Sequence, residues 1–145
     1  MPWRFRFMSF AFSTKSVERM KGVNPQLIII FNEALKNSPI DWGVPNDGGI
    51  RTAIRQNELF ADGNSKCDGY DNLSNHQSGN ALDFYAYVNG KASWEKHHLA
   101  MVAGVIMSTA TRLRKQGKID IELKWGAEFG SNDFNGFDFP HIEVK

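Results

Sequence analysis

The sequence has little cysteine, no long apolar run and almost no net charge, and each of these absences excludes a class of protein. Cys67 is the single cysteine, so the chain forms no internal disulfide and no metal site built from several thiolates. No apolar stretch approaches the roughly 18 residues that a membrane-spanning helix needs, so we expect no stable membrane insertion. The net charge of +1 supplies no strong field for nucleic acid, and we expect no nucleic-acid partner.

The length of 145 residues fits one domain with a substantial core. Hydrophobic residues make up 41% of the chain and charged residues 23%, which is the balance of an ordinary globular domain. Residues 1–8 mix basic and aromatic side chains without the apolar segment of a signal peptide, and we expect a disordered extension there. Residues 9–145 then form the single folded domain, which we expect to act as a monomer.

Helical periodicity with capping residues predicts three helices, and alternating apolar residues predict four strands. The expected helices span residues 25–37, 52–61 and 94–116. The expected strands span residues 40–44, 81–88, 119–125 and 141–145. We expect Ser93 to cap the last helix, with Trp94 and Met101 on its apolar face. Because the order lacks a regular strand–helix–strand rhythm, we expect an α+β fold with a small, mainly antiparallel sheet flanked by helices.

Two short segments carry the residues with metal chemistry. The first runs from Ser74 to Asp83 and contains His76, and the second contains Asp138 and His141. Two histidines and one aspartate leave a fourth position open, as in zinc sites that perform chemistry rather than hold structure. On spacing alone, an ordinary surface or core role for these residues remains the alternative.

Strand alternation places two of these residues on one side of the sheet. In residues 81–88 the apolar side chains share one face, so Asp83 points to the opposite face, away from the core. In the last strand Ile142 and Val144 share a face, so His141 and Glu143 point the other way. If both strands pack on one helical layer, Asp83 and His141 project from the same side, with His76 in a loop just upstream.

Other polar groups are weaker candidates for metal binding. His97 and His98 are neighbours on a predicted helix and point about 100° apart, so they do not readily share one ion, and we expect them on the helix surface. The segment with Asn132, Asp133 and Asn135 offers oxygen ligands without the spacing of an EF-hand. We expect an ordinary loop there, with a regulatory calcium site as the alternative.

The pattern Ser74-x-His76-x-x-Gly79-x-Ala81-x-Asp83, followed by Asp138-x-x-His141, resembles the M15 peptidase family. That family contains D-Ala-D-Ala carboxypeptidases and phage L-alanyl-D-glutamate endopeptidases, the endolysins. Further segments follow in the family's order across residues 9–145, including Gly49-Ile50-Arg51-Thr52, Arg55-Gln56 and Trp125-Gly126. Each motif alone is weak, but the two metal motifs in this order are specific.

The resemblance implies a fold and a set of roles. The fold would be a Hedgehog/DD-peptidase-like single domain, with residues 9–145 as a zinc peptidase catalytic domain. His76, Asp83 and His141 would bind zinc, and Asp138 would be the general base and acid. Arg51 would bind substrate or stabilise the oxyanion. Ser74 and Glu143 are candidates for supporting the metal ligands, although a turn residue and a solvated strand end are equally open readings.

The function implied by the resemblance is cleavage of the L-Ala–D-Glu bond in the stem peptide of bacterial peptidoglycan. The enzyme would reside in the host bacterial cytoplasm and reach the cell wall and periplasm after membrane permeabilisation. The alternatives are a D-Ala-D-Ala carboxypeptidase and a non-catalytic wall-binding or phage structural module. Residues 67–73 look longer than the family pattern, and Gln77-Ser78 replaces a more apolar pair. Both departures lie beside the site and bear on substrate preference.

Overall fold

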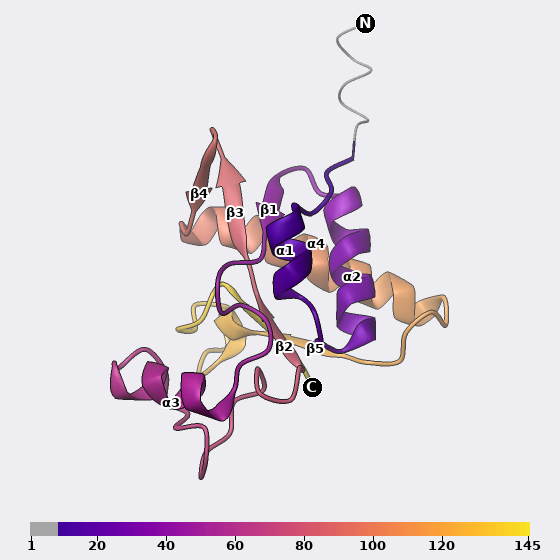
Figure 1. The fold of residues 1–145 in the computed structure, drawn as a ribbon. Coiled ribbons are helices and arrows are strands. Elements are labelled where there is room, and N and C mark those ends of the chain that lie inside the picture. Colours follow the sequence, from indigo (N-terminus) through magenta and orange to yellow (C-terminus); the bar gives the residue numbers. More distant parts are fainter. Residues whose placement is uncertain (1–8) are drawn as a thin grey trace, which may run out of the picture.

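Two three-stranded antiparallel sheets form the framework of the protein (Figure 1). The computed structural model describes residues 9–145, so the expected disordered extension over residues 1–8 lies outside the described residues. One sheet has the order β1 (Asp41–Gly43), β3 (Tyr85–Val88), β4 (Lys91–Ser93). The other has the order β2 (Ala81–Asp83), β6 (His141–Val144), β5 (Leu123–Trp125). With the helices, this arrangement confirms the predicted α+β class.

The expected strand over residues 81–88 is divided between the two sheets. It breaks at Phe84, whose N–H donates to the carbonyl of Pro140 instead of joining a ladder. The predicted apolar face is buried, because Leu82, Phe84 and Ala86 are inaccessible to solvent, but Ala81 on the opposite face is buried as well. The chain therefore passes from one sheet to the other while keeping one face in the core. Asp83 lies at the end of β2, immediately before this crossing.

The helices surround these sheets. Helix α2 (Pro25–Lys36) begins where it was predicted, because the Asn24 side chain accepts a hydrogen bond from the N–H of Gln26. Helix α2 packs against the long helix α4 (Lys96–Lys115), and both contribute to the apolar core. Helix α3 (Ala53–Ala61) begins after its Thr52 cap, and the short helix α1 (Thr14–Arg19) was not predicted. In the described part of the chain, no helix is both long and apolar enough to cross a bilayer.

Three expectations about the later elements were wrong. Ser93 does not cap α4, because it ends strand β4 and Glu95 occupies the cap position. Trp94 therefore precedes the helix and is 52% exposed, while Met101 lies on the outer side of α4. Of the strand expected over residues 119–125, only β5 pairs with a neighbour. Ile119 and Leu123 are nevertheless buried. The apolar pattern therefore predicted correctly which residues are buried, but not which of them pair with a neighbouring strand.

Candidate metal centre and cavity

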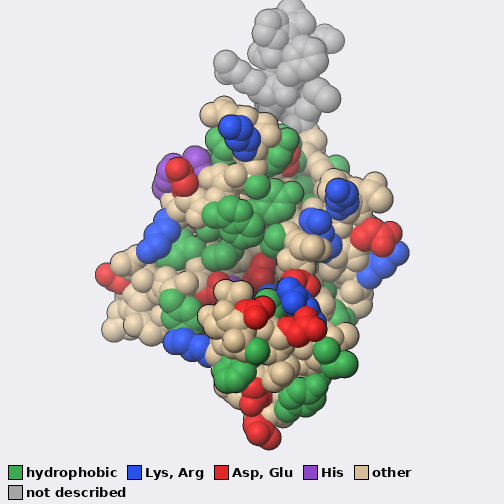
Figure 2. Space-filling model, turned by 60° about the vertical axis from the view of Figure 1, so that its left-hand side comes forward, with side chains coloured by type: hydrophobic (Ala, Val, Ile, Leu, Met, Phe, Trp, Pro, Cys, Tyr) green, Lys and Arg blue, Asp and Glu red, His purple; other side chains and the backbone are tan. Residues whose placement is uncertain are grey.

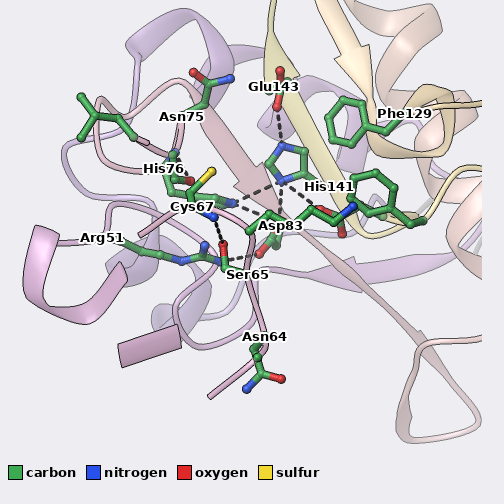
Figure 3. A pocket seen from close by; sticks show the side chains of 16 residues that line it. Arg51, Asn64, Ser65, Cys67, Asn75, His76, Asp83, Phe129, His141 and Glu143 are labelled. Atoms are coloured by element: carbon green, nitrogen blue, oxygen red, sulfur yellow. Dashed lines mark hydrogen bonds and ion pairs between the residues drawn. The ribbon is translucent and has the colours of Figure 1, made fainter. Parts of the chain in front are cut away.

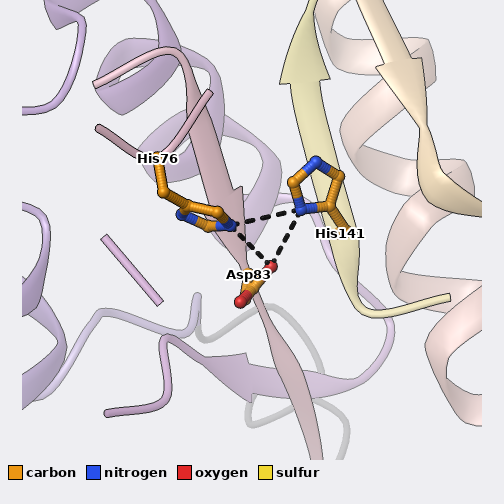
Figure 4. A group of neighbouring side chains, drawn as sticks. All are labelled: His76, Asp83 and His141. Carbon is orange, nitrogen blue, oxygen red and sulfur yellow. Dashed lines mark hydrogen bonds and ion pairs between the residues drawn. The ribbon is translucent and has the colours of Figure 1, made fainter. Parts of the chain in front are cut away.

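The predicted metal residues meet where β2 pairs with β6. Asp83 and His141 are directly opposite each other in the antiparallel register, so their side chains leave the same face of the sheet. His76 comes from the turn before β2 and lies beside them (Figure 4). The parity prediction is confirmed for Asp83 and His141, since they point to a common side. His76 and His141 are nonetheless buried, with side-chain exposures of 2% and 8%.

Three atoms of these residues form a nearly equilateral triangle. His76 Nε2 lies 3.3 Å from His141 Nδ1 and 3.3 Å from Asp83 Oδ1. The third side, from His141 Nδ1 to Asp83 Oδ1, is 3.1 Å. Ligand atoms about 3.3 Å apart are the corners of a tetrahedron whose centre is about 2.0 Å from each, the usual distance from zinc to nitrogen or oxygen ligands. The donor set and its spacing therefore fit a tetrahedral metal ion with one open corner.

Each of the three side chains is fixed through an atom that does not belong to the triangle. His76 Nδ1 is 2.9 Å from the carbonyl oxygen of Gly49, which makes Nδ1 the donor and leaves the Nε2 lone pair for the triangle. His141 Nε2 is 2.8 Å from Glu143 Oε1, and the guanidinium of Arg51 donates to Asp83 Oδ2 at 3.1 Å. Such partners fix the tautomer and orientation of metal ligands.

Arg51 lies mostly buried at the edge of the site. Its guanidinium donates to the carbonyl of Asp47, to Gln56 Oε1 and to Asp83 Oδ2. A guanidinium has five N–H donors, so two remain beyond these contacts. The contact with Asp83 was not part of the sequence prediction. It gives Arg51 a structural role at the metal carboxylate, beside the substrate or oxyanion role that the resemblance implies.

Asp138 stands next to the triangle without belonging to it. Its Oδ2 is 3.8 Å from His141 Nδ1, and its side chain is 38% exposed. Its backbone is held close to η2, a 3₁₀ turn over Gly126–Glu128, through a hydrogen bond from its N–H to the carbonyl of Gly126. A half-exposed carboxylate beside a metal group is suitably placed to exchange protons with a water or a substrate.

The proton equilibria of the site follow from burial and contact. Burial by itself raises the pKa of Asp83, but hydrogen bonds to His141 and His76 outweigh it and hold that pKa well below its usual value. Burial also opposes the charged form of His141, yet hydrogen bonds to Asp83 and Glu143 raise its pKa to about 9. Burial is the main cause that raises the pKa of Asp138 above its ordinary value, and the charge of Asp83 adds to it.

A cavity of about 490 Å³ opens over this group, within the range of small-molecule sites. Figure 2 shows the molecular face hollowed near its centre, with acidic side chains at the bottom beneath a field of hydrophobic ones. Figure 3 shows Glu143 against the ring of His141, and Arg51 reaching toward Asp83. The segment 63–67 and the phenylalanines Phe129 and Phe137 form further parts of the lining. The cavity therefore connects the candidate metal group to the molecular surface.

Supporting residues divide into predicted and unpredicted ones. Ser74 accepts a hydrogen bond from the N–H of His76 through its hydroxyl, so it shapes the turn that carries this ligand. Glu143 contacts His141 directly, as described above. Sequence reasoning assigned no role to Gly49, whose carbonyl orients His76, or to Gln56, which is fully buried and accepts from Arg51. Both residues lie in segments that carry the family resemblance, and this resemblance is the one feature of the sequence that could have indicated a role for them.

A second group of potential ligands lies at the start of α4. Glu95, His97 and His98 place ligand atoms within 4.8 Å of one another. His97 lies on the surface as predicted, but the expectation that the two rings diverge was wrong, since their centroids are 4.0 Å apart. Glu95 and His97 are open to solvent, but His98 is only 21% exposed and lies 2.6 Å from the Ser93 hydroxyl, contrary to its expected surface position. The group stands at the positive end of a helix dipole, which disfavours a cation. The loop with Asn132 and Asp133 was the other weak candidate. In it, the side-chain oxygen of Asn135 accepts a hydrogen bond from the Lys96 ammonium at 3.1 Å.

Comparisons with known proteins identify the family and the fold of the chain. The profile of the family described as phage L-alanyl-D-glutamate peptidase matches residues 8–144. The L-alanyl-D-glutamate peptidase of Escherichia phage T5 is 29% identical over 145 positions, covering 94% of this chain and 99% of that protein. The crystal structure of the Serratia marcescens L-Ala D-Glu endopeptidase ChiX is similar with a TM-score of 0.74 and 28% identity, covering 94% of this chain and 91% of the other. The chain therefore belongs to the phage L-alanyl-D-glutamate peptidase family.

Proposed function

We propose that this chain is a zinc-dependent endopeptidase that hydrolyses the L-Ala–D-Glu bond of the peptidoglycan stem peptide. The single observation that carries the proposal is the triangle of His76, Asp83 and His141, with sides of 3.1–3.3 Å, inside an open cavity. The two relatives named above are L-Ala–D-Glu peptidases, and each matches this chain over nearly the whole length of both proteins. This similarity supports the choice of bond. The complete donor set and the adjacent Asp138 favour an enzyme over a non-catalytic wall-binding module.

The chemistry divides between the bound metal and the residues of the chain. His76, Asp83 and His141 would hold the zinc, which when bound would supply Lewis acidity to polarise a peptide carbonyl and lower the pKa of water. Asp138 accepts a proton from the attacking water and delivers it to the nitrogen of the leaving amine. The C–N bond then breaks, which leaves a carboxylate on the alanyl side and an amine on the glutamyl side. Arg51 retains donors for the negative charge that develops on the carbonyl oxygen.

Mass spectrometry of digested muropeptides tests the bond and the metal together. We expect products that end in L-alanine and begin with D-glutamate, formed by the zinc-loaded protein and lost after chelation. Release of free D-alanine instead would support the carboxypeptidase alternative. A chelated protein that binds cell walls normally, while the zinc-loaded protein releases no product from any wall, would support the non-catalytic module.

We propose further that the enzyme accumulates in the host cytoplasm and reaches the cell wall after the membrane is permeabilised. The family membership supports this proposal, since a phage enzyme is made inside its host. Expression in a bacterium with and without a pore-forming agent tests it. We expect rapid loss of culture turbidity when the pore-forming agent is added, and slow or no loss without it. Lysis at the same rate in both cultures would contradict the proposal.

A further inference from the structure

Lys66 lies in the segment 63–67 and lines the cavity, as do Phe129, Phe137 and Asp138 from a distant part of the chain. The Lys66 ammonium stands 4.5 Å from the centre of the Phe137 ring, so the side chain contacts another residue of the lining. Its neighbours Ser65 and Cys67 line the same cavity as Asp83, His141 and Phe129, all of which Figure 3 labels. Lys66 therefore reaches the space that a bound peptide must occupy.

Charged side chains of both signs line the cavity. Among the described residues, Asp83, Asp138 and Glu143 contribute carboxylates, Arg51 contributes a guanidinium and Lys66 contributes an ammonium. The guanidinium of Arg51 is already bound to Asp83 at 3.1 Å. Within residues 9–145, the Lys66 ammonium makes no ion pair with a carboxylate, and a contact with an exposed aromatic ring is weak. Lys66 is therefore a cation of the cavity whose ammonium is not already bound to a carboxylate, unlike the guanidinium of Arg51.

The backbone that carries Lys66 is firmly held. The fully buried Gln56 donates through Nε2 to Ser65 Oγ at 2.7 Å and to the carbonyl of Cys67 at 2.9 Å. Asn72 Nδ2 donates to the carbonyl of Lys66 itself at 3.3 Å. The residues on both sides of Lys66 are thus fixed to the protein interior, while its side chain is exposed. This arrangement presents a flexible cation from a fixed position, as expected for a group that binds a ligand.

The bond assigned above places a free anion beside the site of cleavage. A glutamyl residue has two carboxyl groups, and whichever one continues the peptide, the other remains as a carboxylate unless it is amidated. In an L-Ala–D-Glu substrate this carboxylate belongs to the residue directly after the scissile bond. The carboxylates of Asp138 and Glu143 repel it, and an ammonium placed close to it would offset that repulsion.

We propose that Lys66 binds the free carboxylate of the glutamyl residue after the scissile bond and so makes the enzyme prefer a glutamate over its amidated form. The proposal rests on the function assigned above and adds a residue that determines specificity.

Two synthetic stem peptides test the proposal, one with the free glutamyl carboxylate and one with a carboxamide in its place. We expect the zinc-loaded protein to cleave the carboxylate peptide with the higher kcat/KM. Lys66→Met removes the charge but keeps an apolar stem against Phe137. We expect it to lower kcat/KM for the carboxylate peptide about fivefold, mainly through KM, as for an ion pair open to solvent, and to leave the carboxamide peptide unchanged.

Two further variants complete the experiment. Lys66→Arg retains the charge and should restore most of the preference. Lys96 provides the matched control, because its ammonium lies 4.9 Å from the centre of the Phe139 ring without lining the cavity, and Lys96→Met should keep the wild-type preference. An unchanged preference in Lys66→Met, or an equal loss in Lys96→Met, overturns the role of Lys66 while leaving the endopeptidase intact. If the wild-type protein cleaves neither peptide between alanine and glutamate, the proposed function fails and this inference fails with it.

Discussion

At the scale of single residues, the geometry of the candidate metal group depends on atoms outside the triangle of potential ligand atoms. His76, Asp83 and His141 each direct one atom to the triangle and use another for a fixed protein partner. Because these partners hold the rings and the carboxylate in place, little ordering of side chains is needed when an ion binds. The site is therefore prepared for its ligand before the ligand arrives.

Sequence reasoning found the residues of the triangle but not most of their partners. His76, Asp83 and His141 have unusual chemistry at recognisable spacings, so a linear motif can identify them. Gly49 acts through a backbone carbonyl, which every residue possesses, and so its side-chain type gives no signal. Glu143 was a candidate partner because strand alternation puts it on the same face as His141. Its contact with His141 depends on side-chain geometry that the alternation alone does not determine.

A substitution at Asp138 should separate loss of catalysis from loss of metal binding. Asp138→Asn keeps the size of the side chain but removes its ability to accept a proton. We expect kcat to fall by roughly 10²- to 10⁴-fold, the usual contribution of a general acid–base group, with bound zinc unchanged. Hydrolysis of a stem peptide and metal content by mass spectrometry measure the two effects. His141→Ala is the comparison and should lose both, whereas an active Asp138→Asn protein would show that another group moves the proton.

At the scale of elements, the alternation of side chains was more predictable than the pairing of strands. The pattern over residues 81–88 correctly separated the buried face from Asp83, because burial follows the two-residue period of any extended chain. It did not predict the break at Phe84, since the same period continues through both strands. The N–H of Phe84 bonds to Pro140, a residue 56 positions away, and no local pattern contains that contact.

The close packing of η2 against the backbone of Asp138 should make Gly126 sensitive to substitution. A Cβ atom on Gly126 would overlap the carbonyl of Asp138 and stand 2.8 Å from its Cβ, so Gly126→Ala must push the two segments apart. A displacement of about 1 Å can cost a catalytic group up to roughly 10²-fold in rate, and we expect at least about a tenfold fall in kcat. We also expect a loss of about 1–3 kcal/mol in the free energy of unfolding, measured by urea denaturation.

Gly104 in α4 provides the control for this substitution, because a Cβ there meets no atom within 4 Å. Gly104→Ala should keep full activity and stabilise the protein by up to about 1 kcal/mol, since alanine favours the helix. Wild-type activity in Gly126→Ala would mean that the loop before β6 adjusts without moving the Asp138 carboxylate.

At the scale of the whole molecule, the metal group joins parts of the chain that are far apart in sequence. His76 belongs to the turn before β2, Asp83 ends β2, and His141 begins the C-terminal strand β6. A ligand that binds only the folded protein stabilises it by mass action, by about 2.7 kcal/mol at 100 times its dissociation constant. We therefore expect zinc to raise the melting temperature of the protein, and chelation to reverse the change.

The size of this zinc-dependent shift in melting temperature should depend on pH through His141. Hydrogen bonds to Asp83 and Glu143 raise the pKa of His141 to about 9 in the metal-free protein, above about 6.5 in an unfolded chain. The protonated His141 thus stabilises the metal-free fold below about pH 6.5, and this stabilisation is lost as pH rises through about 9. Zinc needs the neutral ring, so it must displace this proton, and the zinc-dependent shift in melting temperature should grow between pH 6.5 and 9.

Scanning calorimetry at several pH values measures this shift. Titration calorimetry in buffers of different ionisation enthalpy should detect the release of up to about one proton per zinc at neutral pH. A shift that is constant over this range, with no proton released, would show that His141 does not bind the metal.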